Sequence, residues 1–419
     1  MRSNYRPIGE YITPIKLKNA DLEATELLGI NIDKFFMPSV ANVVGTDLSK
    51  YKVVKKGQFA CNRMHVGRDY RIPIALSERD EPFIVSPAYD VFEITRKDEL
   101  LDEYLMMWFT RPEFDRNAWF HTDADVRGGL PWIMFCSLEL PIPSIEKQRE
   151  IVKEYNTVVN RIKLNEQLNQ KLEETAQALY KHWFVDFEFP DENGKPFKSS
   201  GGKMVWNEEL GKEIPEGWDV DILDNVCKKI TDGSHSSPPG VDIGKPMASV
   251  KDMYDWGLDL KSARTISEND YEALVRGDCK PLHNDILIAK DGSFLKHIFS
   301  IQEEQDVVIL SSIAIIRPND RVLSNFLSLY LKQDLTKRLM TTLANGGAIQ
   351  RIVLKEFKKV PVLVPDKSTQ KDFNKNIQPI FNRCWINFQN GFKLNEIRNI
   401  IMSKMTQVEV EEKEVVDGS

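Results

Sequence analysis

The feature that most constrains the fold is an internal repeat with a period of 222 residues. Tyr104-Leu105 in DEYLMMWFT corresponds to Phe326-Leu327 in SNFLSLYLK, and Gln148 in PIPSIEKQREIV corresponds to Gln370 in LVPDKSTQKDFNKNI. In each half we expect a β-rich region, a short helix, a strand-like apolar run and then a long helix. Because solenoid repeats are only about 20 to 50 residues long, this period predicts two similar domains in tandem.

Each half ends in a long helical pattern whose inward positions alternate in steps of four and three, the spacing of a coiled-coil seam. Asn165 and Asn387 occupy equivalent seam positions, and a polar residue there costs stability but fixes register and partner. We therefore expect the helices to pair; the alternative is that each packs on its own domain. The seam positions are Ile151, Tyr155, Val158, Ile162, Asn165, Asn169, Leu172, Ala176 and Leu179, then Phe373, Ile377, Ile380, Cys384, Asn387, Gly391, Leu394, Arg398, Ile401 and Met405.

The repeat and the helical patterns divide the chain into segments. We expect an α+β fold with domains at 1–144 and 214–365, long helices at 145–187 and 366–407, and a Gly-, Ser- and Pro-rich surface connection at 188–213. The segment 408–419 is an acidic tail. Two similar domains and two long helices that pair with each other form the resulting architecture.

Composition sets broad limits on function. The net charge of −7 opposes binding to nucleic acid, but the sequence after Met405 holds five acids and one Lys, so the remainder is nearly neutral. The five cysteines are scattered and odd in number, which favours a reducing cytoplasm. No apolar run approaches the ~20 residues that span a bilayer, so we expect no membrane association.

Several stretches resemble the specificity subunits of type I restriction–modification enzymes. GQFACNRM with FIVSPAYDVFEI resembles the family's target-recognition pattern, ALYKHWFVDFEFP its closing signature of the central helix, and IPEGWDV the opening of its second domain. KITDGSHSSPP, NDILIAKDGS and AIQRIVLKEFKKVPVLVP resemble second-domain signatures. The first half departs from this pattern, since GGLPWI stands where the second half has GGAIQRI.

The resemblance implies two target-recognition domains that each read one half of a split sequence in double-stranded DNA. It implies that the two helices pair antiparallel as a spacer and as the docking surface for two methyltransferase subunits, which carry S-adenosylmethionine. Restriction motor–nuclease subunits, which use ATP and Mg, join for cleavage. The implied location is the cytoplasm of a prokaryote. Candidates for helix pairing and partner docking are Tyr155, Ile162, Asn165, Leu172, Trp183, Phe184, Ile377, Asn387 and Leu394.

Sequence readout in DNA needs Arg, Lys, Asn, Gln or His at base edges and further cations on phosphates. The richest first-half stretch, KKGQFACNRMHVGRDYR, reads as a loop between strands; the alternative is a solvated surface hairpin. Arg127, before Gly128-Gly129, is a further candidate. The candidates within the stretch are Lys55, Lys56, Asn62, Arg63, His65, Arg68 and Arg71.

In the second half, DGSH with two prolines is a turn signal, and His235 either donates to a base edge or caps the turn. Asp-Gly in AKDGSFLKH indicates a hairpin, around which Lys290, Ser293, Lys296 and His297 lie; Lys290 is the favoured contact to phosphate or base. Gln350 and Arg351 either pair with adenine and guanine edges or cap a strand or helix.

Motifs for catalysis are missing from the sequence. Ser86-Pro87-Ala88-Tyr89 approaches the Pro-Pro-aromatic loop of adenine methyltransferases but has Ala88 in place of the second proline, and Glu356-Phe357-Lys358 lies in a strand-like run without an acidic partner upstream. No Walker-type loop is present, and Cys279 with His283 cannot complete a zinc site. We therefore expect no catalytic centre, metal or cofactor in this chain.

Two other interpretations remain open at this point. A coiled-coil scaffold protein would assemble partners without reading DNA, and a self-sufficient methyltransferase would bind S-adenosylmethionine itself. The aromatic run Tyr180, His182, Trp183, Phe184 and Phe187 suggests base stacking, but its helical spacing favours a packed junction between helix and domain.

Overall fold

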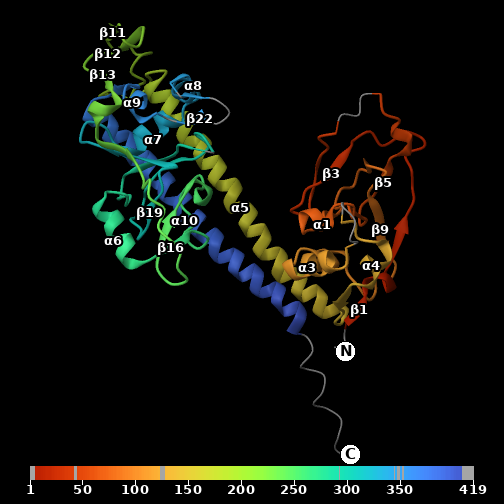
Figure 1. Ribbon diagram of the computed structural model, residues 1–419. Coiled ribbons are helices and arrows are strands. Elements are labelled where there is room, and N and C mark those ends of the chain that lie inside the picture. Colours follow the sequence, from red (N-terminus) through yellow and green to blue (C-terminus); the bar gives the residue numbers. More distant parts are fainter. Residues whose placement is uncertain are drawn as a thin grey trace, which may run out of the picture. The chain divides into compact units, whose positions relative to one another are not determined.

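The computed structural model describes residues 5–41, 45–122, 128–291, 293–343, 345–346, 350–351 and 353–407 (Figure 1). Contacts divide the chain into two compact units: unit 1 is Met1–Ile162 with Lys393–Ser419, and unit 2 is Lys163–Phe392. Both units combine short strands with helices, which confirms the expected α+β class. Within the described ranges, no helix is long and apolar enough to cross a membrane.

Unit 1 is built on a four-stranded antiparallel sheet in the order β2-β9-β6-β7, formed by Ile12–Ile15, Asp90–Ile94, Phe59–Cys61 and Ile74–Leu76. Phe59 and Phe92 stack on adjacent strands and are fully buried. Short antiparallel pairs complete the unit: β1 (Tyr5–Pro7) with β10 (Glu139–Pro141), β3 (Leu28–Ile30) with β4 (Phe36–Pro38), and β5 (Lys52–Val54) with β8 (Phe83–Val85).

Helices cover the phenylalanine core of this sheet. Phe109 from α2 and Phe135 from α4 both contact Phe92 edge-on, and Pro112 starts α3 at a position where a missing N–H costs no hydrogen bond. The helical segments are η1 (Ile8–Glu10), η2 (Leu48–Lys50), α1 (Val66–Asp69), α2 (Asp102–Phe109), α3 (Pro112–Phe120), α4 (Trp132–Ser137) and α5 (Ile145–Phe184).

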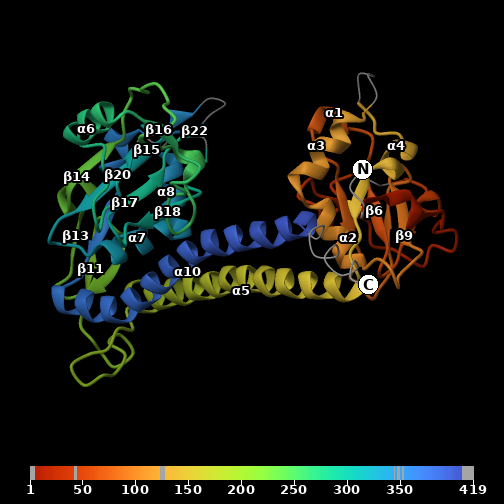
Figure 2. The same ribbon diagram turned by 90° about the horizontal axis from the view of Figure 1, so that it is seen from below.

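Unit 2 contains a second four-stranded antiparallel sheet, in the order β14-β20-β17-β18 (Figure 2). Its strands are Cys227–Asp232, Ile313–Pro318, Ile286–Ala289 and Ile298–Ser300. A smaller sheet, β16-β15-β19, joins Arg264–Ile266, Lys245–Ala248 and Val308–Ile309, and α6 (Glu268–Arg276) is capped by the Ser267 side chain.

The remaining elements of unit 2 include the hairpin β11 (Met204–Asn207) and β12 (Lys212–Pro215), which begins within the segment expected as a surface connection. Glu356-Phe357 lies in helix α9 (Leu354–Phe357), so the expected strand-like run there is wrong. The others are β13 (Asp219–Ile222), η3 (Leu223–Val226), η4 (Val250–Asp252), α7 (Ser324–Lys332), α8 (Asp334–Thr342), β21 (Asn345–Gly346), β22 (Gln350–Arg351), β23 (Pro361–Val364) and α10 (Lys367–Gln407).

The two units repeat one topology. In both, the first strand of the sheet pairs with the fourth, the fourth with the second, and the second with the third. Helices α2, α3, α4 and α5 begin 222 positions before α7, α8, α9 and α10, so each half has three short helices before its long helix where the sequence suggested one. The predicted repeat is thus confirmed. The units differ most between the first and second strands, where unit 2 has β15, β16 and α6.

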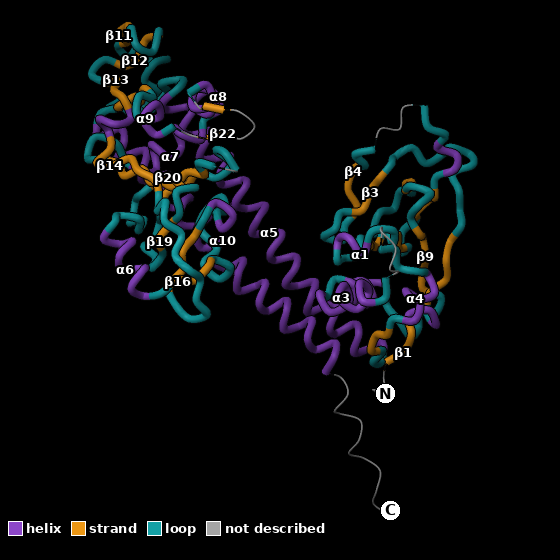
Figure 3. Tube along the Cα trace, viewed as in Figure 1, coloured by secondary structure: helices purple, strands orange, loops and turns teal. Residues whose placement is uncertain are grey.

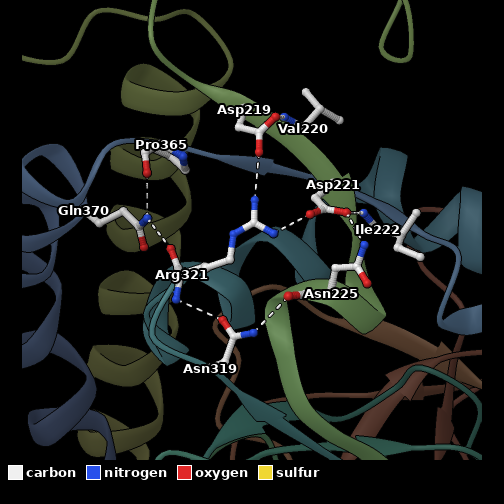
Figure 4. Close-up of polar contacts among 9 residues, drawn as sticks. All are labelled: Asp219, Val220, Asp221, Ile222, Asn225, Asn319, Arg321, Pro365 and Gln370. Carbon is white, nitrogen blue, oxygen red and sulfur yellow. Dashed lines mark hydrogen bonds and ion pairs between the residues drawn. The ribbon is translucent and has the colours of Figure 1, made fainter.

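Equivalent glutamines tie each long helix to its domain. Gln148, fully buried, accepts from the Leu101 N–H (3.0 Å) and donates to the Glu99 and Pro143 carbonyls. Gln370 accepts from the Leu323 N–H (2.9 Å) and donates to the carbonyls of Arg321 and Pro365, each 222 positions later. In unit 2 the Arg321 guanidinium also binds Asp219 and Asp221 on β13 (Figure 4).

The long helices α5 and α10 (Figure 3) pair antiparallel within each unit. In unit 2, Asn387 donates to Asn169 (2.8 Å), while Phe373 packs on Trp183. In unit 1, Lys404 binds Glu154 (2.7 Å), and Ile401 shares a core with Ile151. All predicted seam positions are buried or partly buried, including Tyr155, Ile162, Asn165, Leu172, Ile377 and Leu394, which confirms the seam.

The aromatic run at the end of α5 forms the predicted packed junction. Trp183 and Phe184 are 7% and 1% exposed and belong to the core of unit 2 with Phe326 and Phe373. Tyr180 lies in the same core, and burial raises the pKa of its hydroxyl well above the usual value. These rings therefore fix the helix to the second domain.

A buried ion pair organises the edge of unit 1. The Lys34 ammonium lies 2.7 Å from the Asp115 carboxylate of α3 and also donates to the Phe109 carbonyl. Asp115 accepts from the Ile72 N–H (3.1 Å) and lies 3.6 Å from Arg71, so it holds the end of the loop between β6 and β7. Burial lowers the pKa of Lys34 to about 8, although Asp115 opposes this effect.

The Asn169–Asn387 pair predicts a non-additive double-mutant cycle. Asn387→Leu removes the hydrogen bond that Asn387 donates to the partly buried side-chain amide of Asn169. This change should lower the free energy of unfolding by about 1–3 kcal/mol. Asn169→Leu with Asn387→Leu should cost much less than the sum of the single changes, because both polar groups leave the seam together. Chemical denaturation measures this, with exposed Asn160→Leu as a control expected to stay within about 0.5 kcal/mol. Strict additivity would show that the two amides do not act as a pair.

The Lys34–Asp115 pair predicts a pH-dependent mutant. Asp115→Asn leaves a buried ammonium without its carboxylate and should destabilise unit 1 by about 3–5 kcal/mol at pH 7. Because the folded-state pKa of Lys34 is depressed to about 8, wild type itself loses this charge above that pH. The stability gap between variant and wild type should therefore narrow as pH rises from 7 to 9.5. Urea denaturation across this range measures it, and a constant gap would exclude Lys34 ionisation as the cause.

Candidate nucleic-acid interface

The structure separates the first-half candidates into two groups at opposite ends of strand β6. Lys55 and Lys56 precede the strand; both are exposed, and Lys56 pairs with Asp80 (2.6 Å). Asn62, Arg63, His65, Arg68 and Arg71 follow it in the loop of residues 62–73, which joins β6 to β7 and contains α1. Strand β6 divides the stretch that the sequence predicted as one loop, so the prediction is wrong for Lys55 and Lys56 and holds only for the group after β6, which forms one continuous segment.

Arg63 is the most enclosed arginine of this loop, with a side chain only 18% exposed. Its Nε and Nη2 both lie 2.7 Å from Asp90 Oδ2 at the start of β9, its Nη1 donates to the Leu130 carbonyl, and its guanidinium stacks over Trp132. The backbone N–H of Leu130 donates to the Arg63 carbonyl (2.9 Å). Arg63 therefore joins the loop to the segment Gly128–Trp132.

A backbone hydrogen bond also connects the β6–β7 loop to the segment Gly128–Trp132. The Gly67 N–H donates to the Gly128 carbonyl (2.8 Å), and a Cβ on either glycine would lie 2.6 Å from the other's Cα. Gly128 has φ +58°, a conformation that favours glycine. The structure thus brings together the loop after β6 and the Gly128-Gly129 segment. Arg127 itself lies outside the described residues.

The other polar candidates of the β6–β7 loop differ in how far they are exposed to solvent. Arg68 is 64% exposed and binds Asp69, whose pKa it lowers through that hydrogen bond. Arg71 is 42% exposed and reaches Asp33 (2.9 Å). His65 is partly buried at the start of α1, and the side-chain oxygen Oδ1 of Asn62 accepts from the Met64 N–H (3.1 Å). Arg68 and Arg71 present the loop's positive charge to solvent.

Sequence reasoning missed an exposed aromatic group beside this loop. Tyr70 is 61% exposed with φ 57°, and its ring contacts Trp119 at the end of α3; Phe120 is 81% exposed. The repeat offered a signal, because Thr341-Thr342 stand at the equivalent positions of α8. The fold does not need aromatic rings there, so we add them to the candidate surface.

In unit 2 the predicted hairpin is confirmed: residues 290–297 join β17 to β18. Lys290 is not on the surface, since its side chain is 5% exposed and its ammonium binds Asp232, the last residue of β14. His235 is 74% exposed and lies 3.3 Å from the same carboxylate. The loop after β17 and the DGSH turn after β14 therefore meet at one end of the sheet.

The other second-half candidates occupy varied positions. Ser293 is partly buried, and its N–H donates to the Asp291 carbonyl; Lys296 is exposed, and His297 binds Asp255 (2.8 Å). Gln350 and Arg351 form strand β22 opposite β21, but their side chains lie outside the described structure. Among the residues that are described, no group of three or more His, Cys, Asp and Glu lies close enough to share a metal ion.

Comparisons with known proteins agree with this architecture. Residues 215–397 match the type I restriction modification DNA specificity domain. The type I restriction enzyme MjaIX specificity subunit of Methanocaldococcus jannaschii is 24% identical over 332 residues, covering 76% of this chain and 72% of that protein. The HindI specificity subunit of Haemophilus influenzae is 25% identical over 436 residues, covering 90% and 92%.

A solved structure shares the fold. The S subunit of a type I restriction-modification system from M. genitalium matches with a TM-score of 0.54 at 14% identity, covering 96% of this chain and 95% of that one. The repeated domains, the paired long helices and the matched specificity domain agree with one another. The chain is similar over most of its length to specificity subunits of type I restriction–modification systems, and residues 215–397 match their DNA specificity domain.

Proposed function

We propose that this chain reads a bipartite sequence in duplex DNA, one half through each domain, and docks two adenine methyltransferase subunits. The observation that carries the proposal is the repetition of one sheet and helix frame with different loops at the same sheet end. After the second strand, unit 1 presents Arg68 and Arg71, whereas the equivalent loop of unit 2 carries Lys296, and the exposed His235 lies in the DGSH turn after the first strand. Different loops on the same frame can bind two different DNA half-sites, while the shared frame can bind two identical methyltransferase subunits.

Partner docking belongs to the same proposal. The paired helices α5 and α10 offer a repeated surface, so two copies of one methyltransferase subunit can bind equivalent places. In this proposal the chain itself has no catalytic centre: the methyltransferase carries S-adenosylmethionine, and motor–nuclease subunits that join through it carry ATP and Mg. A cytoplasmic location in a prokaryote fits such an assembly.

The competing function is a scaffold that assembles partners without reading DNA. The two proposals differ in their response to salt, because neutralising phosphates releases counterions. For the complex of this chain with its methyltransferase subunits, we expect duplex affinity to fall by about 10³- to 10⁵-fold between 50 and 200 mM salt, as for 6–10 phosphate contacts. Fluorescence anisotropy measures this, with the methyltransferase alone as control.

Methylome sequencing of cells that carry the full gene set supplies the target. One split motif with modified adenine on both strands is expected. Duplex binding by the complex that is no stronger than that of the methyltransferase alone, together with no split motif, would favour the scaffold.

A further inference from the structure

Each domain holds an enclosed cation just after the second strand of its sheet. Arg63 follows β6 and Lys290 follows β17, and these are equivalent second strands in the shared topology. Their side chains are 18% and 5% exposed, and each binds a carboxylate at the end of another strand of the same sheet. The carboxylates differ in origin: Asp90 starts β9, whereas Asp232 ends β14. The two domains thus reach one arrangement with different residues.

In unit 1 the cation connects three segments. The Arg63 fork binds Asp90 with two nitrogens and the Leu130 carbonyl with the third, so the β6–β7 loop, the start of β9 and the Gly128–Trp132 segment are fixed together. The Gly67–Gly128 hydrogen bond holds the two backbones so close that a Cβ on either glycine would clash with the other. The exposed Arg68 and Arg71 lie in the same loop that Arg63 fixes.

In unit 2 the cation connects the equivalent loop to a different neighbour. The Lys290 ammonium binds Asp232, and the backbone N–H of Lys290 donates to the Ser312 carbonyl (2.9 Å). The β17–β18 loop is therefore connected to the turn after β14 and to the start of β20. Gly233 packs directly on the Ile309 carbonyl, where a Cβ would lie at 2.1 Å. His235 extends from this turn into solvent.

Stability does not explain these pairs. Replacing a buried ion pair by apolar residues is often neutral or stabilising, so a buried pair is weak evidence for a stabilising role. The planar guanidinium of Arg63 and the enclosed ammonium of Lys290 instead fix the orientation of the carboxylates and carbonyls that they bind. Nor do the two cations face solvent as a phosphate contact requires.

We infer that Arg63 and Lys290 are positioning residues, which set the two loops that read each half-site and do not contact DNA themselves. The inference rests on the proposed function. Sequence preference at one half-site then depends on each ion pair, while the number of phosphate contacts does not. Each pair acts only on the half-site of its own domain.

The test uses the complex of the full chain with its methyltransferase subunits and duplexes with single mismatches in either half-site. Two variants probe unit 1: Arg63→Lys keeps the charge but loses the fork, and Arg63→Met with Asp90→Leu removes both charges. Both should reduce discrimination at one half-site at least about fivefold, the lower end of what a mismatched base pair contributes. The other half-site and the salt slope should not change. Lys290→Met with Asp232→Leu should do the same at the opposite half-site.

A matched control removes an exposed ion pair from the same domain. Arg79, in the connection after β7, lies 2.6 Å from Glu26, which precedes β3, and the two side chains are 43% and 51% exposed. Arg79→Met with Glu26→Gln should leave both half-sites and the slope unchanged.

Unchanged discrimination in the folded Arg63 variants, or a slope reduced by about 0.9 as for one lost phosphate contact, would overturn the inference. If wild type shows no sequence-dependent binding, the proposed function fails instead.

Discussion

One buried glutamine in each repeat couples a long helix to its domain. Gln148 and Gln370 each satisfy a backbone N–H and two carbonyls at equivalent places, where the short helices begin and where the long helix follows its proline. An apolar side chain there would leave three polar backbone groups without partners, which makes the position hard to change. The orientation of each helix start, and so the seam that continues from it, depends on this amide.

The rest of the structure divides into a shared frame and variable loops. The sheet order, the short helices and the start of each long helix recur 222 residues apart, while the loops after β6 and β17 and the insertions before them differ. The repeated frame fits the proposed binding of two identical methyltransferase subunits. The differing loops fit the proposed binding of two different DNA half-sites. Under the proposed function, the single chain has two different DNA-reading domains built on one frame.

Periodic features of the sequence predicted the fold well. The repeat, the four-three seam and the equivalent Asn165 and Asn387 rest on spacing alone, and the structure confirms all of them. The polar contact across the seam was not predictable in detail: Asn387 binds Asn169, whose repeat equivalent is Gly391. Pairing between helices depends on how the two seams face each other, which spacing within one helix does not fix.

Individual site residues were less predictable because burial depends on distant partners. Lys290 looked like an available cation beside a turn, but Asp232, 58 residues earlier, encloses it. Lys56 and Arg68 belong to one basic stretch, yet a strand separates them. Trp119 and Phe120 were not predicted as surface residues, because aromatic residues in a helix usually pack in the core. The threonines at the equivalent positions, Thr341 and Thr342, show that the shared fold does not require aromatic rings there.

The central claim is that each domain reads its own half of one split target. Exchanging residues 1–144 for the corresponding region of a specificity subunit with another target tests this directly, by methylome sequencing of cells that also hold the modification subunits. The account predicts that one half of the methylated motif changes while the other half and the gap stay the same. A motif in which both halves change, or neither does, would contradict it.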